Sequence, residues 1–194
     1  MAGDIFRVAE GIRIPHVGEV HPAYEVEKNE DGWRFTVVLD APRIPHLLWD
    51  YCQILPEPGY FTLELPEEAE DVYDIYYVDG CTRPVLQAIA KRYGDLLTAD
   101  GYARFGFAAH EAPEQLYISD LKTIQIYSRS LEPVTALLKN YGVPEEKDCQ
   151  KLWDILSDEN PCELIHVEVE EESVFDLPQL LADAGIYLAG QRRV

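Results

Sequence analysis

The sequence predicts an α+β fold, with one largely antiparallel sheet and helices packed mainly on one of its faces. Three features of the chain support this fold class. Strand-like runs, in which apolar residues occupy every second position, come first along the chain. Segments with apolar residues at helical spacing follow, mixed with further strands, and strict βαβ alternation is absent. No linker rich in Pro, Gly or Ser divides the chain, and we therefore expect residues 1–194 to form a single domain.

The strands are predicted from their period of two. The first two, at residues 23–28 and 33–39, flank Asp31-Gly32, a pair that suits a hairpin turn. The apolar face of the second run consists of Trp33, Phe35, Val37 and Leu39. Further strands are expected at residues 60–65, 72–78, 102–108, 115–118, 123–127, 163–170 and 186–189.

The helices are predicted from apolar stripes and from residues that suit helix ends. Pro84 fits the first turn of the longest helix, and Ser173 with Asp176 resembles a capping box. Gly142 and Gly185 follow the last apolar residues of two other stripes, as expected of helix ends. Helices are expected at residues 44–53, 82–97, 130–142, 144–156 and 173–185.

The charge of the chain limits its partners. It carries 16 Lys and Arg against 36 Asp and Glu, a net charge of −20, and each half of the chain contributes −10. Nucleic acid and anionic membrane surfaces are excluded as expected partners, because phosphate binding needs clustered Lys and Arg. Basic proteins and metal cations suit this charge better. The chain shows no secretory signal and no apolar stretch long enough to span a membrane, and a cytoplasmic location is expected.

No sequence motif in the chain identifies a catalytic reaction. Glycine-rich phosphate loops, the GxSxG nucleophile turn and the HExxH zinc motif are all absent. Widely spaced cysteines are expected to be buried free thiols, namely Cys52, Cys81, Cys149 and Cys162. Cys81 lies where a helix could lower a thiol pKa, but its acidic neighbours oppose this effect. We predict no catalytic residue, no metal site and no cofactor.

Two acidic segments are the candidate site. The stretch LPEEAEDVYDIYYVDG, residues 65–80, interleaves carboxylates with tyrosines, which are enriched at the cores of protein interfaces. Its candidate binding residues are Glu67, Glu68, Glu70, Asp71, Tyr73, Asp74, Tyr76, Tyr77 and Asp79. A second cluster, at a predicted strand-to-helix turn, consists of Glu168, Glu170, Glu171 and Glu172. Carboxylates around such a surface would steer a basic protein towards it, whereas the alternative is a solvated strand whose tyrosines partly enter the core.

The C-terminal stretch ENPCELIHVEVEEESVFDLPQLLADAGIYLAGQRRV, residues 159–194, is similar to the tails of immunity proteins of bacterial toxin systems. The small, acidic, motif-free chain as a whole also resembles that group. The resemblance implies a protein without catalytic activity that binds and inactivates one cognate toxin, often a nuclease with a basic cleft. Two alternatives stay open: a metal-assisted hydrolase built on His110, Glu111 and scattered carboxylates, and an accessory regulatory subunit.

Overall fold

An eight-stranded sheet, antiparallel throughout, forms the centre of the computed structural model, which describes residues 6–67 and 72–193. In sheet order its strands are β10 (Tyr187–Arg193), β5 (Val72–Cys81), β4 (Gly59–Pro66), β6 (Arg104–Ala109), β7 (Gln115–Ile118), β8 (Ile124–Ser128), β3 (Gly32–Val38) and β2 (Ala23–Asn29). The predicted α+β class is confirmed. A small second sheet, β1 (Ile12–Arg13) with β9 (Glu163–Leu164), was not expected.

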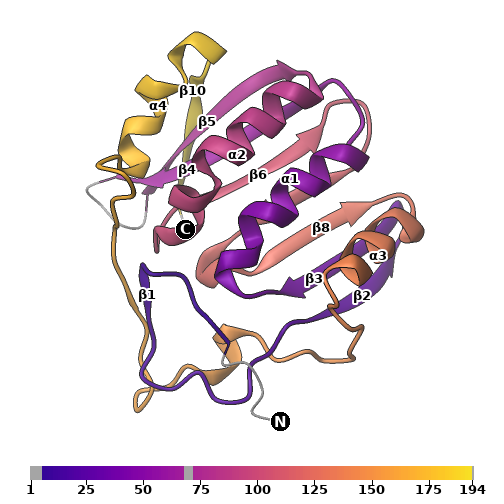
Figure 1. Ribbon diagram of the computed structural model, residues 1–194, viewed down its shortest axis with the longest axis vertical. Coiled ribbons are helices and arrows are strands. Elements are labelled where there is room, and N and C mark those ends of the chain that lie inside the picture. The colour runs from indigo at the N-terminus through magenta and orange to yellow at the C-terminus, as the bar shows by residue number, and fades with distance from the viewer. Residues whose placement is uncertain (1–5, 68–71, 194) are drawn as a thin grey trace.

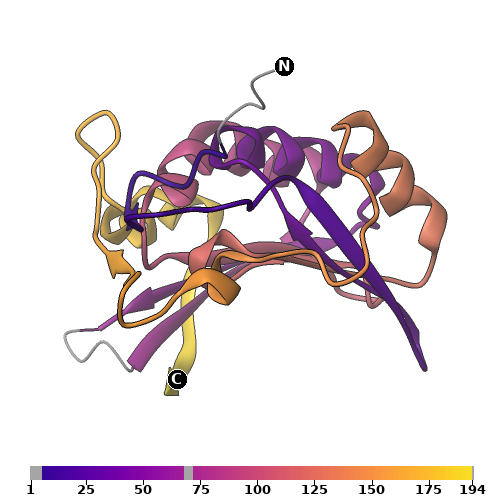
Figure 2. The same ribbon diagram turned by 90° about the horizontal axis from the view of Figure 1, so that it is seen from below.

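Three helices cover one face of the large sheet (Figures 1 and 2). They are α1 (Ile44–Ile54), α2 (Arg83–Ala99) and α3 (Leu131–Asn140), close to the predicted bounds. Between sheet and helices lie fully buried aromatic side chains, among them Phe35, Phe61, Phe105 and Phe107. In the described residues, the opposite face of the sheet has no helical layer (Figure 2). We call this side the open face.

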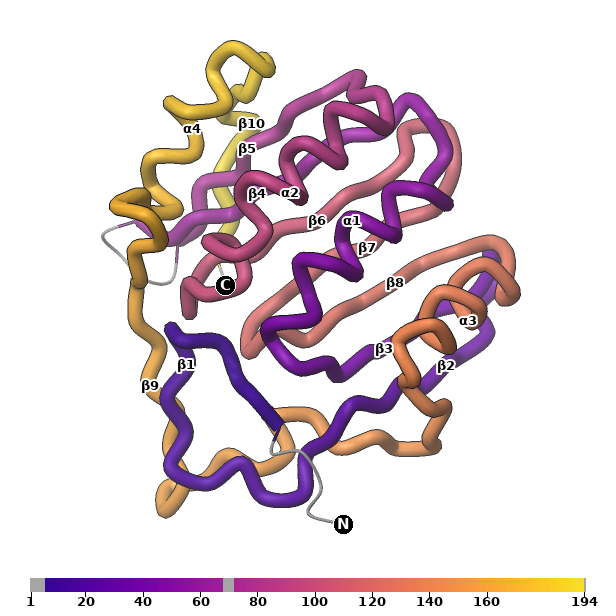
Figure 3. The backbone as a smooth tube through the Cα atoms, viewed as in Figure 1, coloured from indigo at the N-terminus to yellow at the C-terminus, as the bar shows by residue number. Residues whose placement is uncertain are grey.

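The helix predicted over residues 144–156 is wrong. The backbone of this segment runs along the outer edge of β2, where Tyr24 N donates to Pro144 O and Glu146 N donates to Tyr24 O. Asp148 has a φ of 57°, and only a 3₁₀ turn, η3 (Leu152–Ile155), forms. The segment runs beside the N-terminal residues (Figure 3). Apolar side chains of both segments form a second core. Pairing with β2 and this core override the helical pattern.

The strand predicted over residues 163–170 is present only as the two residues of β9. Beyond it the backbone bonds to other groups: Gly101 N donates to Ile165 O, and Val167 N donates to a carboxylate oxygen of Asp100. These backbone groups therefore find hydrogen-bond partners outside any strand. The capping box of Ser173 and Asp176 is confirmed.

The last predicted helix is broken into short pieces: η4 (Val174–Asp176), α4 (Leu177–Leu180) and η5 (Ala182–Ala184). Gly185, with a φ of 81°, ends the last of them, as expected of a left-handed cap. The final strand is confirmed and is longer than predicted. It becomes β10, which pairs with β5 along an edge of the sheet (Figure 1).

Candidate partner-binding surface

The register of the sheet decides which side chains reach the open face. Phe61 and Leu63 of β4 are buried against the helices, and successive strand residues alternate between faces, so Tyr60, Thr62 and Glu64 point to the open face. Residues paired across strands share a face. The cross-strand pairs thus place six tyrosines on the open face: Tyr60, Tyr73, Tyr77, Tyr117, Tyr127 and Tyr187.

One corner of the open face is built from aromatic rings around a carboxylate. The ring centroids of Tyr60 and Tyr77 are 5.5 Å apart, those of Tyr77 and Tyr187 are 6.2 Å apart, and both pairs pack edge to face. His110 lies 5.1 Å from Tyr60 by ring centroids and forms an ion pair with Asp79. The Tyr187 hydroxyl donates to Asp79 Oδ2 at 3.4 Å. We call these five residues the aromatic corner.

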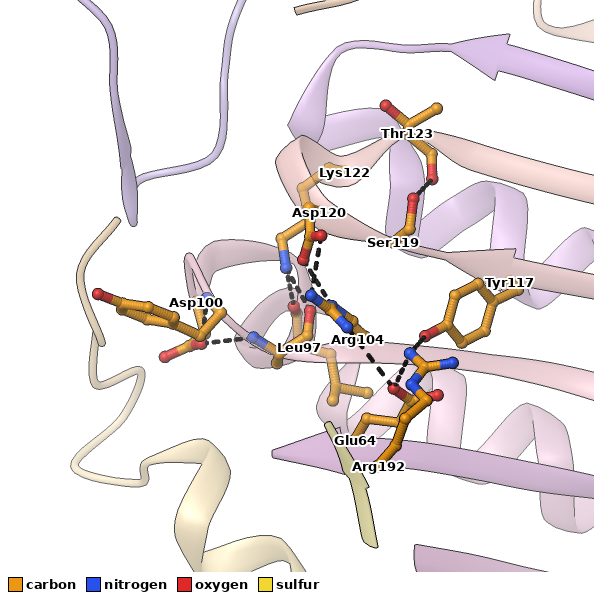
Figure 4. A network of polar contacts seen from close by, with 12 residues as sticks. Glu64, Leu97, Asp100, Arg104, Tyr117, Ser119, Asp120, Lys122, Thr123 and Arg192 are labelled. Atoms are coloured by element: carbon orange, nitrogen blue, oxygen red, sulfur yellow. Dashed lines mark hydrogen bonds and ion pairs between the residues drawn. The ribbon is translucent and has the colours of Figure 1, made fainter. Parts of the chain in front are cut away.

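A buried arginine lies on the open face at the start of β6. Arg104 Nε donates to Asp120 Oδ1 at 2.5 Å and its Nη2 donates to Asp120 Oδ2 at 2.9 Å (Figure 4). Glu64 Oε2 lies 4.0 Å from Arg104 Nη1, and the guanidinium carbon of Arg104 is 4.1 Å from the ring centroid of Tyr73. Burial alone would lower the pKa of Arg104, but the hydrogen bonds and charge of Asp120 outweigh it and raise the pKa.

The C-terminal strand is tied into the same network. Arg192 Nη2 contacts Glu64 Oε2 at 2.5 Å and the hydroxyl of Tyr117 at 3.4 Å (Figure 4). Burial and the neighbouring Glu64 raise the pKa of Tyr117. The network keeps this face pre-organised, because its side chains are held by several partners each.

A buried lysine lies at the end of the network. Lys122 Nζ donates to Leu97 O at 3.3 Å and to Ala103 O at 2.7 Å (Figure 4). Burial lowers the pKa of Lys122 to about 8, against the opposing charges of Asp100 and Asp120.

The contribution of Lys122 to stability should therefore rise with pH in alkaline solution. Between the folded pKa of about 8 and the ordinary lysine value, the unfolded chain binds a proton that folded Lys122 releases. Relative to a Lys122→Met variant, the wild type should gain about 1 kcal/mol in free energy of unfolding from pH 7 to pH 9. Urea unfolding of both proteins at the two pH values measures this gain. An equal change in the free energy of unfolding of both proteins between pH 7 and pH 9 would contradict a buried lysine with a lowered pKa.

The first predicted acidic segment does not form one surface. Tyr77 and Asp79 join the aromatic corner, whereas Tyr73 is buried beneath Arg104. Asp74 and Tyr76 point to the helical side of the sheet, where the Tyr76 hydroxyl donates to Asp74 Oδ2 at 3.2 Å.

Glu67 and Asp74 of this segment both contact the C-terminal strand. Gln191 Nε2 of β10 donates to Glu67 at 2.5 Å and to Asp74 at 3.0 Å. Glu68, Glu70 and Asp71 lie outside the described residues. The binding role of the segment stays a prediction.

The second predicted cluster lies in a turn that contacts α2 through ion pairs. Glu170 and Glu171 occupy its tip with φ values of 53° and 66°. Arg92 of α2 pairs with Glu170 at 3.7 Å and with Glu172 at 2.7 Å. Two of the four carboxylates are thus engaged within the chain, while Glu168 and Glu171 are exposed.

Four tyrosines of the open face were missed from the sequence: Tyr60, Tyr117, Tyr127 and Tyr187. A usable signal was present, because Tyr117 stands between Leu116 and Ile118 in a predicted strand. Alternation places such a tyrosine opposite the core. The order of the strands, which brings the tyrosines together, is not written in any local pattern.

The cysteines and the candidate metal ligands that the structure describes form no group able to hold a metal ion. All four cysteines are free thiols; Cys52, Cys81 and Cys149 are buried and Cys162 is half-buried. Burial raises the pKa of Cys81, the thiol at the strand-to-helix junction. Within residues 6–67 and 72–193, no three His, Cys, Asp or Glu side chains are grouped so that they could hold a metal ion.

Comparisons with protein-family models, curated proteins and solved structures return no match to this chain. Among the described residues, no helix combines the length and the apolar character needed to cross a membrane.

Proposed function

We propose that this protein is a non-catalytic inhibitor that binds a basic protein through its open face, and that the partner is a bacterial toxin. The observation that carries the proposal is the row of tyrosines on the open face of the sheet, in a chain of net charge −20. Such a chain would be an immunity protein.

Tyrosine suits this role for physical reasons. Its ring supplies a large contact area at low conformational cost, and its hydroxyl keeps the surface soluble before the partner arrives. Tyr187 is 46% exposed, and Tyr60, Tyr77, Tyr117 and Tyr127 are half-buried, so a partner can still cover them. The negative charge of the whole molecule would raise the association rate with a basic protein.

Affinity capture with matched baits tests the proposal. The wild type, a Tyr77→Ala/Tyr187→Ala variant and a Trp49→Ala/Val85→Ala control are compared as baits in lysate of the source cells. Trp49 and Val85 are exposed apolar residues of α1 and α2, on the helical side. We expect the wild type and the control to retain one basic protein at low salt, and the open-face variant to retain about tenfold less.

The captured protein must also behave as a toxin. Its expression alone should stop bacterial growth, and co-expression of this chain, but not of the open-face variant, should restore it. Retention of no basic protein, equal retention by all three baits, or a captured protein that is harmless on its own would reject the proposal.

A further inference from the structure

The strand carboxylates of the open face differ in how their charge is neutralised. In the described strands they are Glu25, Glu27, Glu64 and Asp79. Glu25 is paired with Lys151 at 2.9 Å, Glu27 with Arg34 at 2.5 Å and Glu64 with Arg192 at 2.5 Å. These three carboxylates each face a permanently charged side chain within the fold.

Asp79 is the exception among them. Within the described residues, its ionic partner is His110, and histidine, unlike lysine or arginine, is not a permanent cation at neutral pH. The Asp79 side chain is 46% exposed, and its remaining contacts are the Tyr187 hydroxyl and the backbone N–H of Gly80 at 3.0 Å. Among the four strand carboxylates compared within the described residues, Asp79 alone has no arginine or lysine partner, and it lies among aromatic rings.

An arginine side chain matches this combination. Its planar guanidinium can lie over a tyrosine ring and bind a carboxylate with two N–H groups at once. The same pairing already exists in this molecule, where Arg104 lies over the ring of Tyr73 and binds Asp120 through two nitrogens. At the aromatic corner the ring and the carboxylate are present, and no arginine of the described residues is paired with Asp79.

We propose that the aromatic corner is the anchor site for one arginine side chain of the basic partner, held between Asp79 and the rings of Tyr77 and Tyr187. The inference rests on the proposed function and names the group that the open face recognises. When this arginine binds, it displaces His110 from Asp79, so His110 acts as a competitor that covers the carboxylate in the free protein.

A small probe tests the site without the partner. N-acetyl-L-arginine amide is titrated at constant ionic strength, and the ring signals of Tyr60, Tyr77 and Tyr187 are followed by NMR. Its neutral counterpart, N-acetyl-L-citrulline amide, has nearly the same shape and no charge. We expect saturable shifts of these rings with the arginine probe, and an affinity at least about fivefold higher than for citrulline.

Three variants assign the binding to Asp79. Asp79→Asn should weaken the arginine probe about fivefold, whereas the control Glu27→Gln, which removes the same charge at the other end of the face, should leave it within about twofold. His110→Gln should strengthen the binding of the probe at least about twofold, because it removes the imidazole ring that contacts Asp79 in the free protein. A gain in affinity cannot arise from a damaged fold.

Equal binding of arginine and citrulline, equal effects of Asp79→Asn and Glu27→Gln, or no gain with His110→Gln would each overturn the inference. These outcomes are separate from the capture experiment. A basic toxin retained equally by the wild type and by Asp79→Asn would leave the proposed function standing and reject the arginine site. A probe that binds as expected, with no basic protein captured, would reject the function and leave a cation site.

Discussion

An Arg104→Met variant should lose about 3–5 kcal/mol of its free energy of unfolding. The Arg104 side chain is 7% exposed and faces the carboxylates of Asp120 and Glu64. Methionine fills similar space but leaves the charge of Asp120 without its partner, and such a loss costs more than the intact pair contributes. Urea denaturation at pH 7 measures the change.

Arg34→Met is the matched control, because Arg34 pairs with Glu27 on the same face of the same sheet. Its side chain is 41% exposed and that of Glu27 is 58% exposed, so solvent screens the pair and the loss should stay below about 1 kcal/mol. If both variants lost the same amount, burial of the Arg104 network would not be what stabilises this face.

An Asp100→Ala variant should lose about 3–5 kcal/mol of its free energy of unfolding. The fully buried carboxylate of Asp100 accepts hydrogen bonds from the backbone N–H groups of Tyr102 and Ala103, both at 2.9 Å. Its second oxygen accepts from Val167 N at 3.3 Å and contacts His166 Nδ1 at 2.9 Å. Alanine removes all of these acceptors, and each orphaned buried donor costs about 1–3 kcal/mol.

Asp100→Ala should also destabilise one region of the fold more than the rest. Hydrogen exchange should accelerate first at Val167 and its neighbours, because Asp100 holds this segment against the end of α2. Asp176→Ala is the control: Asp176 also accepts a backbone N–H, from Ser173, but in an exposed turn, and its removal should cost far less. Uniform exchange along the chain in Asp100→Ala would contradict the local role.

Strands of the large sheet were predictable because their local pattern and their final environment agree. Phe61 and Leu63 alternate with polar residues, and the sheet has one covered and one open face. Residues 144–156 were not predictable in the same way. Their apolar residues have helical spacing, yet Leu152 is buried in the second core while Trp153 is 50% exposed. Contacts with distant segments decide this region, and no local window contains them.

The acidic segment shows the same limit at the candidate site. Its density of carboxylates and tyrosines suggested one surface, but a strand sends neighbouring residues to opposite faces, so Asp74 and Tyr77 separate. That division could have been read from the period of two. The meeting of Tyr60, Tyr77 and Tyr187 could not, because it depends on β10 joining β5.

The strand order has a consequence for the speed of folding. The chain leaves the sheet after β3, builds β4 to β7, and returns to pair β8 with β3, so that Trp33 faces Ser128. At the other edge Ile75 faces Gly190. Both pairings close long loops, whose entropy is lost before their contacts form. We expect this chain to fold in milliseconds to seconds, the range of proteins rich in non-local strand pairs, and to complete the aromatic corner among its last steps.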